Sequence, residues 1–276
     1  MVYCEDRGST NGTWVNGRCI GAGKSVLLLD GDTVDIPGGV CFHFMASRTR
    51  KPAPLDEQSR RDQDCLCWPY RLTDRVLGSG SYGKVYLAVD RNGDQVACKV
   101  VDMKPPPAAA TAATARREGS AVSDWERALR EVDILMTLNH PNVIDIKDYY
   151  KNDKQSRLYI FEELVTHGDL FSFMNARDNK ALEEDEARPI VWQLLKALQY
   201  LHDRKIVHRD LKASSTTPPP PGSLVRGAEI CKPENILRAS QEVAGRIVLV
   251  DFGTARVLKG RSRMLTATGT KQFAAP

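Results

Sequence analysis

Short alternating segments of apolar and polar residues fill the first 45 positions and predict β-structure there. Gly, Asn and Asp separate the segments, as in Val15-Asn16-Gly17 and Asp30-Gly31-Asp32. Asn-Gly and Asp-Gly accept the positive φ angles of tight turns, so they favour antiparallel hairpins. Residues 46–69 then mix prolines with charges of both signs, which is a composition typical of a linker.

A second alternating region predicts strands at 85–89 and 95–101, with a further strand at 159–164. Residues 125–138 and 186–202 have apolar positions every three or four residues, which predicts helices. Because strands come first and the clearest helix comes later, residues 70–276 are expected to form a β-rich part followed by a helical part.

Composition narrows the class of protein. The 276 residues are 42% hydrophobic, and 39 basic against 35 acidic side chains give a net charge of +4. That excess is too small to indicate a nucleic acid or membrane partner. No apolar run approaches the ~20 residues of a membrane helix, and residues 1–10 do not resemble a signal peptide. Seven scattered cysteines indicate reduced thiols in an intracellular protein.

Candidate chemistry begins with the G-x-G-x-x-G sequence at 78–83. In dinucleotide-binding folds such glycines lead into a helix, whereas here they lead into a predicted strand, which argues against a dehydrogenase. A strand–glycine loop–strand unit covers nucleotide phosphates in protein kinases. On the next predicted strand, Lys99 can neutralise phosphates, and Glu131 on the predicted helix can orient it. The alternative is that Lys99 and Glu131 are unrelated surface charges.

Two further sequences add a reaction centre, His-Arg-Asp-Leu-Lys at 208–212 and Asp-Phe-Gly at 251–253. Asp210 can accept the proton of a substrate hydroxyl, and Lys212 can neutralise the transferred phosphoryl group. Asp251 can hold Mg²⁺, and Asn235 supplies a ligand for a second metal position. Their order along the chain is the order that phosphoryl transfer by a protein kinase requires.

Residues 70–276 therefore resemble a eukaryotic serine/threonine protein kinase. Residues 1–45, through positions 8–17 and 29–36, resemble the C-terminal part of a forkhead-associated (FHA) domain. This order resembles the checkpoint kinases of the calmodulin-kinase-like group, and residues 159–164 and 168–172 are similar to the fungal meiosis-specific type. The resemblance implies an α+β fold: a two-lobe kinase fold with a complete β-rich lobe and a truncated helical lobe, preceded by a partial FHA β-sandwich.

The resemblance also implies ATP and Mg²⁺ as cofactors and assigns the site residues. The ATP-binding set is Leu77, Gly78, Gly80, Gly83, Val85, Ala97, Lys99, Glu163, Val165, Asp169 and Leu237, with Asp169 meeting the ribose. The catalytic set is Asp210, Lys212, Lys99 and Glu131, and the metal ligands are Asn235 and Asp251. Thr266 or Thr268 is the expected regulatory phosphorylation site.

In the FHA part, Thr10 and Asn11 match positions that contact phosphothreonine peptides, although Asn-Gly also makes a turn without any ligand. The implied partners are protein substrates with Ser or Thr, and phosphothreonine proteins bound by the FHA domain of the full-length protein. Direct nucleic-acid and membrane contacts are not expected, and the nucleus is the expected location.

Three departures from the family pattern leave the activity of the chain as written open. Residues 213–232 interrupt the catalytic loop, and their removal restores an uninterrupted family sequence, which suggests an unspliced intron. The chain stops before the remaining helices of the large lobe, so the apolar stripe of 186–202 is expected to be exposed. The FHA part lacks its first strands, which argues against phosphopeptide binding by this chain. The alternative function is an ATP-binding or scaffolding product without catalysis.

Overall fold

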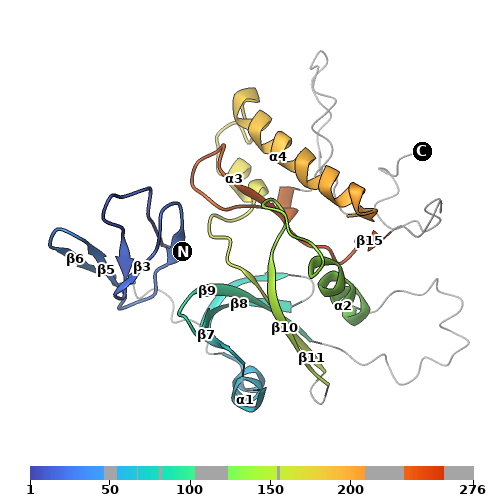
Figure 1. The fold of residues 1–276 in the computed structure, drawn as a ribbon, viewed down its shortest axis with the longest axis horizontal. Coiled ribbons are helices and arrows are strands. Elements are labelled where there is room, and N and C mark those ends of the chain that lie inside the picture. Colours follow the sequence, from blue (N-terminus) through green and yellow to red (C-terminus); the bar gives the residue numbers. More distant parts are fainter. Residues whose placement is uncertain are drawn as a thin grey trace, which may run out of the picture. The chain divides into compact units, whose positions relative to one another are not determined.

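The computed structural model describes residues 1–46, 55–66, 68–80, 83–102, 124–153, 156–208 and 233–257 (Figure 1). It divides into two compact units: Met1–Lys99 with Glu163–Thr166, and Val100–Glu162 with His167–Pro276. Strands come before the main helices, as predicted, and the fold class is α+β.

The N-terminal part of the first unit consists of short antiparallel strands. Strand β1 (Tyr3–Glu5) pairs with β4 (Ser25–Leu27), and a second sheet has the order β3-β2-β5-β6. Its strands are β2 (Trp14–Val15), β3 (Arg18–Cys19), β5 (Thr33–Ile36) and β6 (Val40–His43). The predicted Asn16-Gly17 turn joins β2 to β3, and both residues have positive φ, 51° and 76°. The turn chemistry of the sequence therefore determines this hairpin.

Within the predicted linker, the structure contains a helix, α1 (Glu57–Leu66). Asp56 starts it by accepting the Ser59 N–H at 3.0 Å and the Ser59 hydroxyl at 2.7 Å. The helix is tied to the following strand, because the Leu72 N–H donates to Gln63 Oε1 at 2.6 Å. A segment that looks like a linker by composition is thus partly a capped, packed helix.

A five-stranded sheet has the order β10-β11-β9-β8-β7. Its strands are β7 (Tyr70–Gly80), β8 (Gly83–Asp90), β9 (Gln95–Asp102), β10 (Ile146–Asn152) and β11 (Arg157–Glu163). Consecutive residues are buried in three of these strands, as in Tyr86–Ala88, Val96–Cys98 and Leu158–Phe161. Such runs show that both faces of these strands are covered, which explains why their sequences are continuously apolar.

The short N-terminal sheets of the first unit contact the start of β9. The Gln95 side-chain amide pairs with both backbone groups of Leu27: Leu27 N–H donates to Oε1, and Nε2 donates to Leu27 O, each at 2.8 Å. The hydroxyls of Ser25 and Thr166 are 2.6 Å apart. Because Leu27 is fully buried, the Gln95 amide supplies the hydrogen bonds that water cannot supply there.

Among the described residues of the second unit are three α-helices, α2 (Asp124–Leu135), α3 (Leu170–Asn175) and α4 (Glu184–Asp203). The longest, α4, begins with three acidic residues, which suit the positive end of the helix dipole. It buries Ile190, Leu194, Ala197 and Leu201. Val191, Trp192 and Leu195 are 40%, 60% and 51% exposed, so the predicted apolar stripe is only partly covered within the described structure.

Two small strand pairs position the chain after α4. β12 (Ile206–Val207) pairs with β15 (Arg256–Val257), and β13 (Ile236–Arg238) pairs with β14 (Ile247–Leu249) after the 3₁₀ turn Pro233–Asn235. Asn142 anchors β14: its Nδ2 donates to Ile247 O at 2.8 Å and its carbonyl accepts the Leu249 N–H at 2.9 Å. These pairs hold residues 233–257 in place.

Candidate active site

The glycine-rich sequence lies between two paired strands. β7 and β8 are antiparallel, with Gly78 opposite Val85 and Gly80 opposite Gly83. The prediction that these glycines lead into a strand and not a helix is confirmed. Leu77 and Val85, the predicted adenine contacts on this hairpin, are only half-buried. A Cβ built on Gly78 would meet no atom within 4 Å, so the surface above this glycine is open.

Lys99 lies on β9, as predicted, and is half-buried beside the buried Cys98 and Val100. Ala97, on the same strand, is 8% exposed. The segment Glu163–Thr166 carries Glu163 and Val165, both half-buried. These residues belong to the first unit, and the pairing of Lys99 with Glu131 stays a prediction.

In the second unit, Glu131 connects α2 to the Asp-Phe-Gly turn. Glu131 is 3% exposed, and its Oε1 accepts the Phe252 N–H at 3.3 Å. A Cβ built on Gly253 would lie 3.4 Å from Asp251 Oδ1 and 3.8 Å from Glu131 Oε2. These are ordinary contact distances, so both carboxylates lie beside the Gly253 backbone.

Asp251 has the features of a cation ligand. Its φ is +64°, a left-handed conformation that is uncommon for residues other than Gly, Asn and Asp. Its Oδ1 is buried and has no hydrogen-bond partner within the described structure. A buried carboxylate oxygen without a partner is costly, and Mg²⁺ prefers such oxygens. The site therefore fits the predicted metal.

Asn235, the second predicted metal ligand, is held close to Asp251 along the backbone. The carbonyl of Asn235 accepts the Val250 N–H at 2.9 Å, and Asn235 is 5% exposed. No group of three or more His, Cys, Asp or Glu side chains able to hold a metal occurs among the described residues. Mg²⁺ sites commonly use one or two protein ligands with substrate phosphates, which matches this arrangement.

His208 stands immediately before the undescribed part of the catalytic loop. Its Nε2 donates to Val250 O at 3.1 Å, and its carbonyl accepts the Thr254 hydroxyl at 2.9 Å. Its ring packs edge-on against the Phe252 ring, with 4.7 Å between the two ring centroids. The chain entering the loop is therefore fixed by the Asp-Phe-Gly turn. Asp210, Lys212, Thr266, Thr268 and the insertion 213–232 lie outside the described residues.

Asp169 and Leu237 are brought together from distant parts of the chain, because they form an isolated antiparallel bridge. Asp169 caps α3: Oδ1 accepts the Ser172 N–H at 2.7 Å, and Oδ2 accepts the Ser172 hydroxyl at 2.8 Å. The predicted ribose ligand and one predicted adenine contact are thus neighbours.

The loop that carries Thr10 and Asn11 is organised by Asp6, a residue that sequence reasoning missed. Both predicted residues are exposed, whereas Asp6 is 1% exposed. Its carboxylate accepts backbone N–H groups from Gly8, Ser9 and Thr13 at 2.8–3.0 Å. These hydrogen bonds, that from Ser9 foremost, lower the pKa of Asp6.

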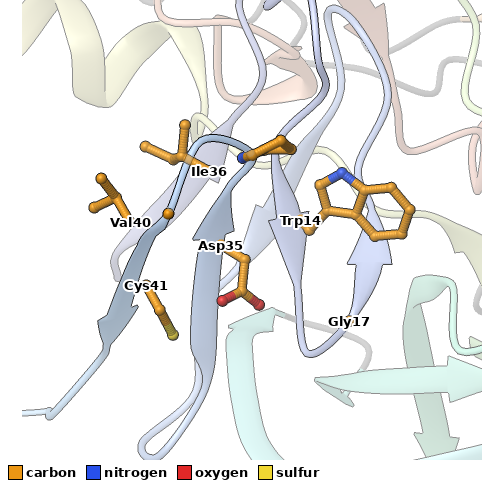
Figure 2. Close-up of a pocket in the computed structure, with 8 residues that line it drawn as sticks. Trp14, Gly17, Asp35, Ile36, Val40 and Cys41 are labelled. Atoms are coloured by element: carbon orange, nitrogen blue, oxygen red, sulfur yellow. The ribbon is translucent and has the colours of Figure 1, made fainter.

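A pocket of about 440 Å³ lies elsewhere in the N-terminal part, on β2, β5 and β6. Its walls are Trp14, Gly17, Asp35, Ile36, Pro37, Gly39, Val40 and Cys41. Figure 2 shows Ile36 and Val40 on either side of the β5–β6 turn, with Trp14 on a neighbouring strand. None of the predicted kinase or phosphopeptide residues lines it.

Among the helices in the described ranges, none combines the length and apolar character needed to cross a bilayer.

Comparison with known proteins adds two family matches. The protein kinase domain model matches residues 72–215, just over half of the chain, and the FHA domain model matches residues 1–37.

Several curated proteins align with all or nearly all of the chain. The chain is 36% identical to the meiosis-specific serine/threonine-protein kinase mek1 of Schizosaccharomyces pombe, over all of this chain and 52% of that protein. It is 31% identical to MEK1 of Saccharomyces cerevisiae, over all of this chain and 51% of that protein. It is 26% identical to RAD53 of the same yeast, over 97% of this chain and 32% of that protein. The chain thus spans about half the length of the first two relatives.

The chain belongs to the protein kinase family, and a match to the FHA domain precedes its kinase domain.

Proposed function

We propose that the whole protein transfers the γ-phosphoryl group of ATP to Ser and Thr hydroxyls of proteins in a meiotic or DNA-damage checkpoint. The observation that carries the proposal is the Asp-Phe-Gly turn. Glu131 holds the turn at the Phe252 N–H, beside an Asp251 oxygen without a partner in the described structure. The relatives named as meiosis-specific serine/threonine kinases support the proposed process.

In this proposal, the chain's own residues bind and neutralise the nucleotide. Lys99, oriented by Glu131, attracts the α- and β-phosphates, and the glycine hairpin covers them with backbone N–H groups. Asp251 and Asn235 hold Mg²⁺, which supplies positive charge to the phosphate oxygens. Glu163 and Val165 offer backbone groups to adenine, while Asp169 binds the ribose.

The transfer step uses residues outside the described ranges, so these roles follow from the resemblance. Asp210 accepts the proton of the substrate hydroxyl while that oxygen forms a bond to the γ-phosphorus. The bond from this phosphorus to the oxygen of the β-phosphate breaks, and ADP leaves. Lys212 neutralises the group in transit, so catalysis rests on positioning and charge stabilisation.

The test uses the full-length protein without residues 213–232. D210N is expected to keep ATP binding and lose phosphotransfer to a Ser/Thr peptide, since the amide cannot accept the proton. D251N is expected to lose the Mg²⁺ dependence of ATP affinity measured by calorimetry. D203N, at an exposed position at the end of α4, is the matched control and keeps both properties. Unchanged phosphotransfer in D210N refutes the assignment.

A second candidate function, an ATP-binding scaffold without turnover, is favoured by the twenty-residue interruption at 213–232. A shift of about 1 Å in a catalytic group can cost roughly 100-fold in rate. Calorimetry with Mg-ATP beside a peptide phosphorylation assay separates the two candidates. Binding without transfer by the full-length protein that retains residues 213–232 supports the scaffold. The transcript across this junction shows whether the twenty codons are retained.

The remaining assignments belong to the same proposal. The domain boundaries are 1–45 for the FHA part, 46–69 for the linker and 70–276 for the kinase part. The FHA domain of the whole protein binds phosphothreonine proteins, with Thr10 and Asn11 in the contacting loop. Phosphorylation of Thr266 or Thr268 activates the kinase, and the protein works in the nucleus.

A further inference from the structure

A buried arginine stands at the end of β13, directly after Leu237. Arg238 is 6% exposed, and its Nε has no hydrogen-bond acceptor within the described structure. Its Nη2 donates to Gln241 O at 2.7 Å. Desolvation lowers the pKa of this guanidinium. Burying a cation with so few polar partners is costly, so the residue needs a compensating role.

Besides its ladder pairing with Ile247 on β14, Arg238 makes three contacts at the start of α3. Its backbone N–H donates to Gly168 O at 2.8 Å, and its carbonyl accepts the His167 N–H at 3.0 Å. The guanidinium carbon lies 3.6 Å from the centre of the Phe173 ring. Arg238 therefore contacts both the segment His167–Gly168, which leads into α3, and the Phe173 side chain in its first turn.

Asp169 lies between these two points of contact. It follows Gly168, it bridges to Leu237, and its carbonyl accepts the Phe173 N–H at 3.1 Å. Its two carboxylate oxygens are already oriented by Ser172. Any shift of Gly168 or Phe173 moves the Asp169 carboxylate, because this short helix turn is held at both ends by Arg238.

We propose that Arg238 is a positioning residue that holds the Asp169 carboxylate in place for the ribose hydroxyls of ATP. The inference rests on the proposed function, in which Asp169 binds the ribose. A planar guanidinium packs on an aromatic face, whereas a lysine ammonium cannot reproduce that contact. Arg238→Lys therefore keeps the charge and removes the flat packing surface.

The test measures ribose discrimination, which a general loss of stability does not change. Calorimetry with the chain gives the affinities for Mg-ATP and for its 2′-deoxy and 3′-deoxy analogues. The wild-type chain is expected to bind at least one deoxy analogue about tenfold more weakly than ATP. The discrimination ratio is the affinity for ATP divided by the affinity for the deoxy analogue. D169A is expected to bring this ratio close to one, and R238K is expected to reduce it. The R238K/D169A chain resembles D169A alone.

Two further variants make the test decisive. F173L removes the other half of the stack without touching the cation, and it is expected to reduce the ratio like R238K. R246K is the matched control, because the Arg246 Nε donates to Pro141 O and not to α3. The ratio stays at the wild-type value in R246K.

The outcomes separate the two proposals. A wild-type chain that binds no Mg-ATP overturns this inference, and the same failure in the full-length protein without residues 213–232 overturns the proposed function as well. Discrimination that is lost in D169A but intact in R238K and F173L overturns the role of Arg238 and leaves the proposed function standing. Additive losses in R238K/D169A also overturn it, since they show that the two residues act separately.

Discussion

Asp6 shows how much one carboxylate can determine in a glycine-rich loop. Three backbone N–H groups converge on it, and they belong to residues on both sides of Thr10 and Asn11. Loops of this composition lose much conformational entropy when they become ordered, so such hydrogen bonds decide whether they adopt one shape. The predicted phosphopeptide loop therefore depends on a residue that itself touches no peptide.

We expect the loop to loosen in acid. The folded-state pKa of Asp6 is lowered from 3.8, so its stabilisation is complete above that value and is lost as the pH falls through the lower folded value. Amide hydrogen exchange at Ser9 and Thr13 should accelerate as the pH falls below 3.8, beyond the intrinsic pH trend. D6N should exchange fast already at neutral pH.

The exposed Asp64 on α1 offers a control for this pH effect, because D64N changes a carboxylate that lies outside the loop. In D64N, the pH profile of amide hydrogen exchange at Ser9 and Thr13 should match that of the wild-type chain. Equal protection of these amides in D6N and wild type would contradict the assigned role of Asp6.

Individual elements depend on partners that are far away in sequence. Leu27 on β4 is fully buried, and the Gln95 side chain satisfies both of its backbone groups from the start of β9. The Gln95 side-chain amide makes the two hydrogen bonds to Leu27 that a neighbouring β-strand would make with its backbone. The edge of the β1–β4 pair is thereby closed at Leu27 by a side chain.

Gln95→Ala should therefore destabilise the first unit. It leaves a buried N–H and a buried C=O unpaired, and each costs about 1–3 kcal/mol of the free energy of unfolding. Urea unfolding followed by circular dichroism measures the loss. Gln199→Ala, at an exposed position on α4, should unfold close to the wild-type midpoint. A Q95A midpoint equal to that of wild type would show that the amide contributes nothing.

Elements with strong local signals could be predicted from the sequence. The apolar spacing of 186–202 predicts α4 (Glu184–Asp203), and the Asn16-Gly17 pair predicts its hairpin. Helix α1 was missed because it is highly polar and its start depends on the Asp56–Ser59 cap. The contact between Arg238 and Phe173 was also missed, because a packing pair separated by so many residues leaves no pattern in either segment.

At the scale of the whole molecule, one helix face is poorly covered. Val191, Trp192 and Leu195 lie close together along α4 and are 40–60% exposed within the described structure. Contiguous apolar surface of this kind favours association between molecules. The 276-residue chain should therefore form concentration-dependent oligomers through α4.

Leu195→Lys should shift the chain toward the monomer in size-exclusion chromatography with light scattering. The free energy of unfolding should change by no more than about 0.5 kcal/mol, as for most surface substitutions. Leu194→Lys is the buried counterpart on the same helix and should unfold the second unit. Unchanged oligomer size in L195K would show that α4 does not mediate the association.

Val250 holds both ends of the catalytic loop at one point: its N–H donates to Asn235 O, and its carbonyl accepts His208 Nε2. These two hydrogen bonds involve no residue between 208 and 233, so they do not depend directly on the length of the connecting segment. Lengthening that connection from four to twenty-four residues adds only about 1.6 kcal/mol of closure entropy. We therefore expect this loop to accept an inserted sequence, from a splicing error or from engineering, at little cost to folding, while the insertion disturbs the placement of the catalytic groups.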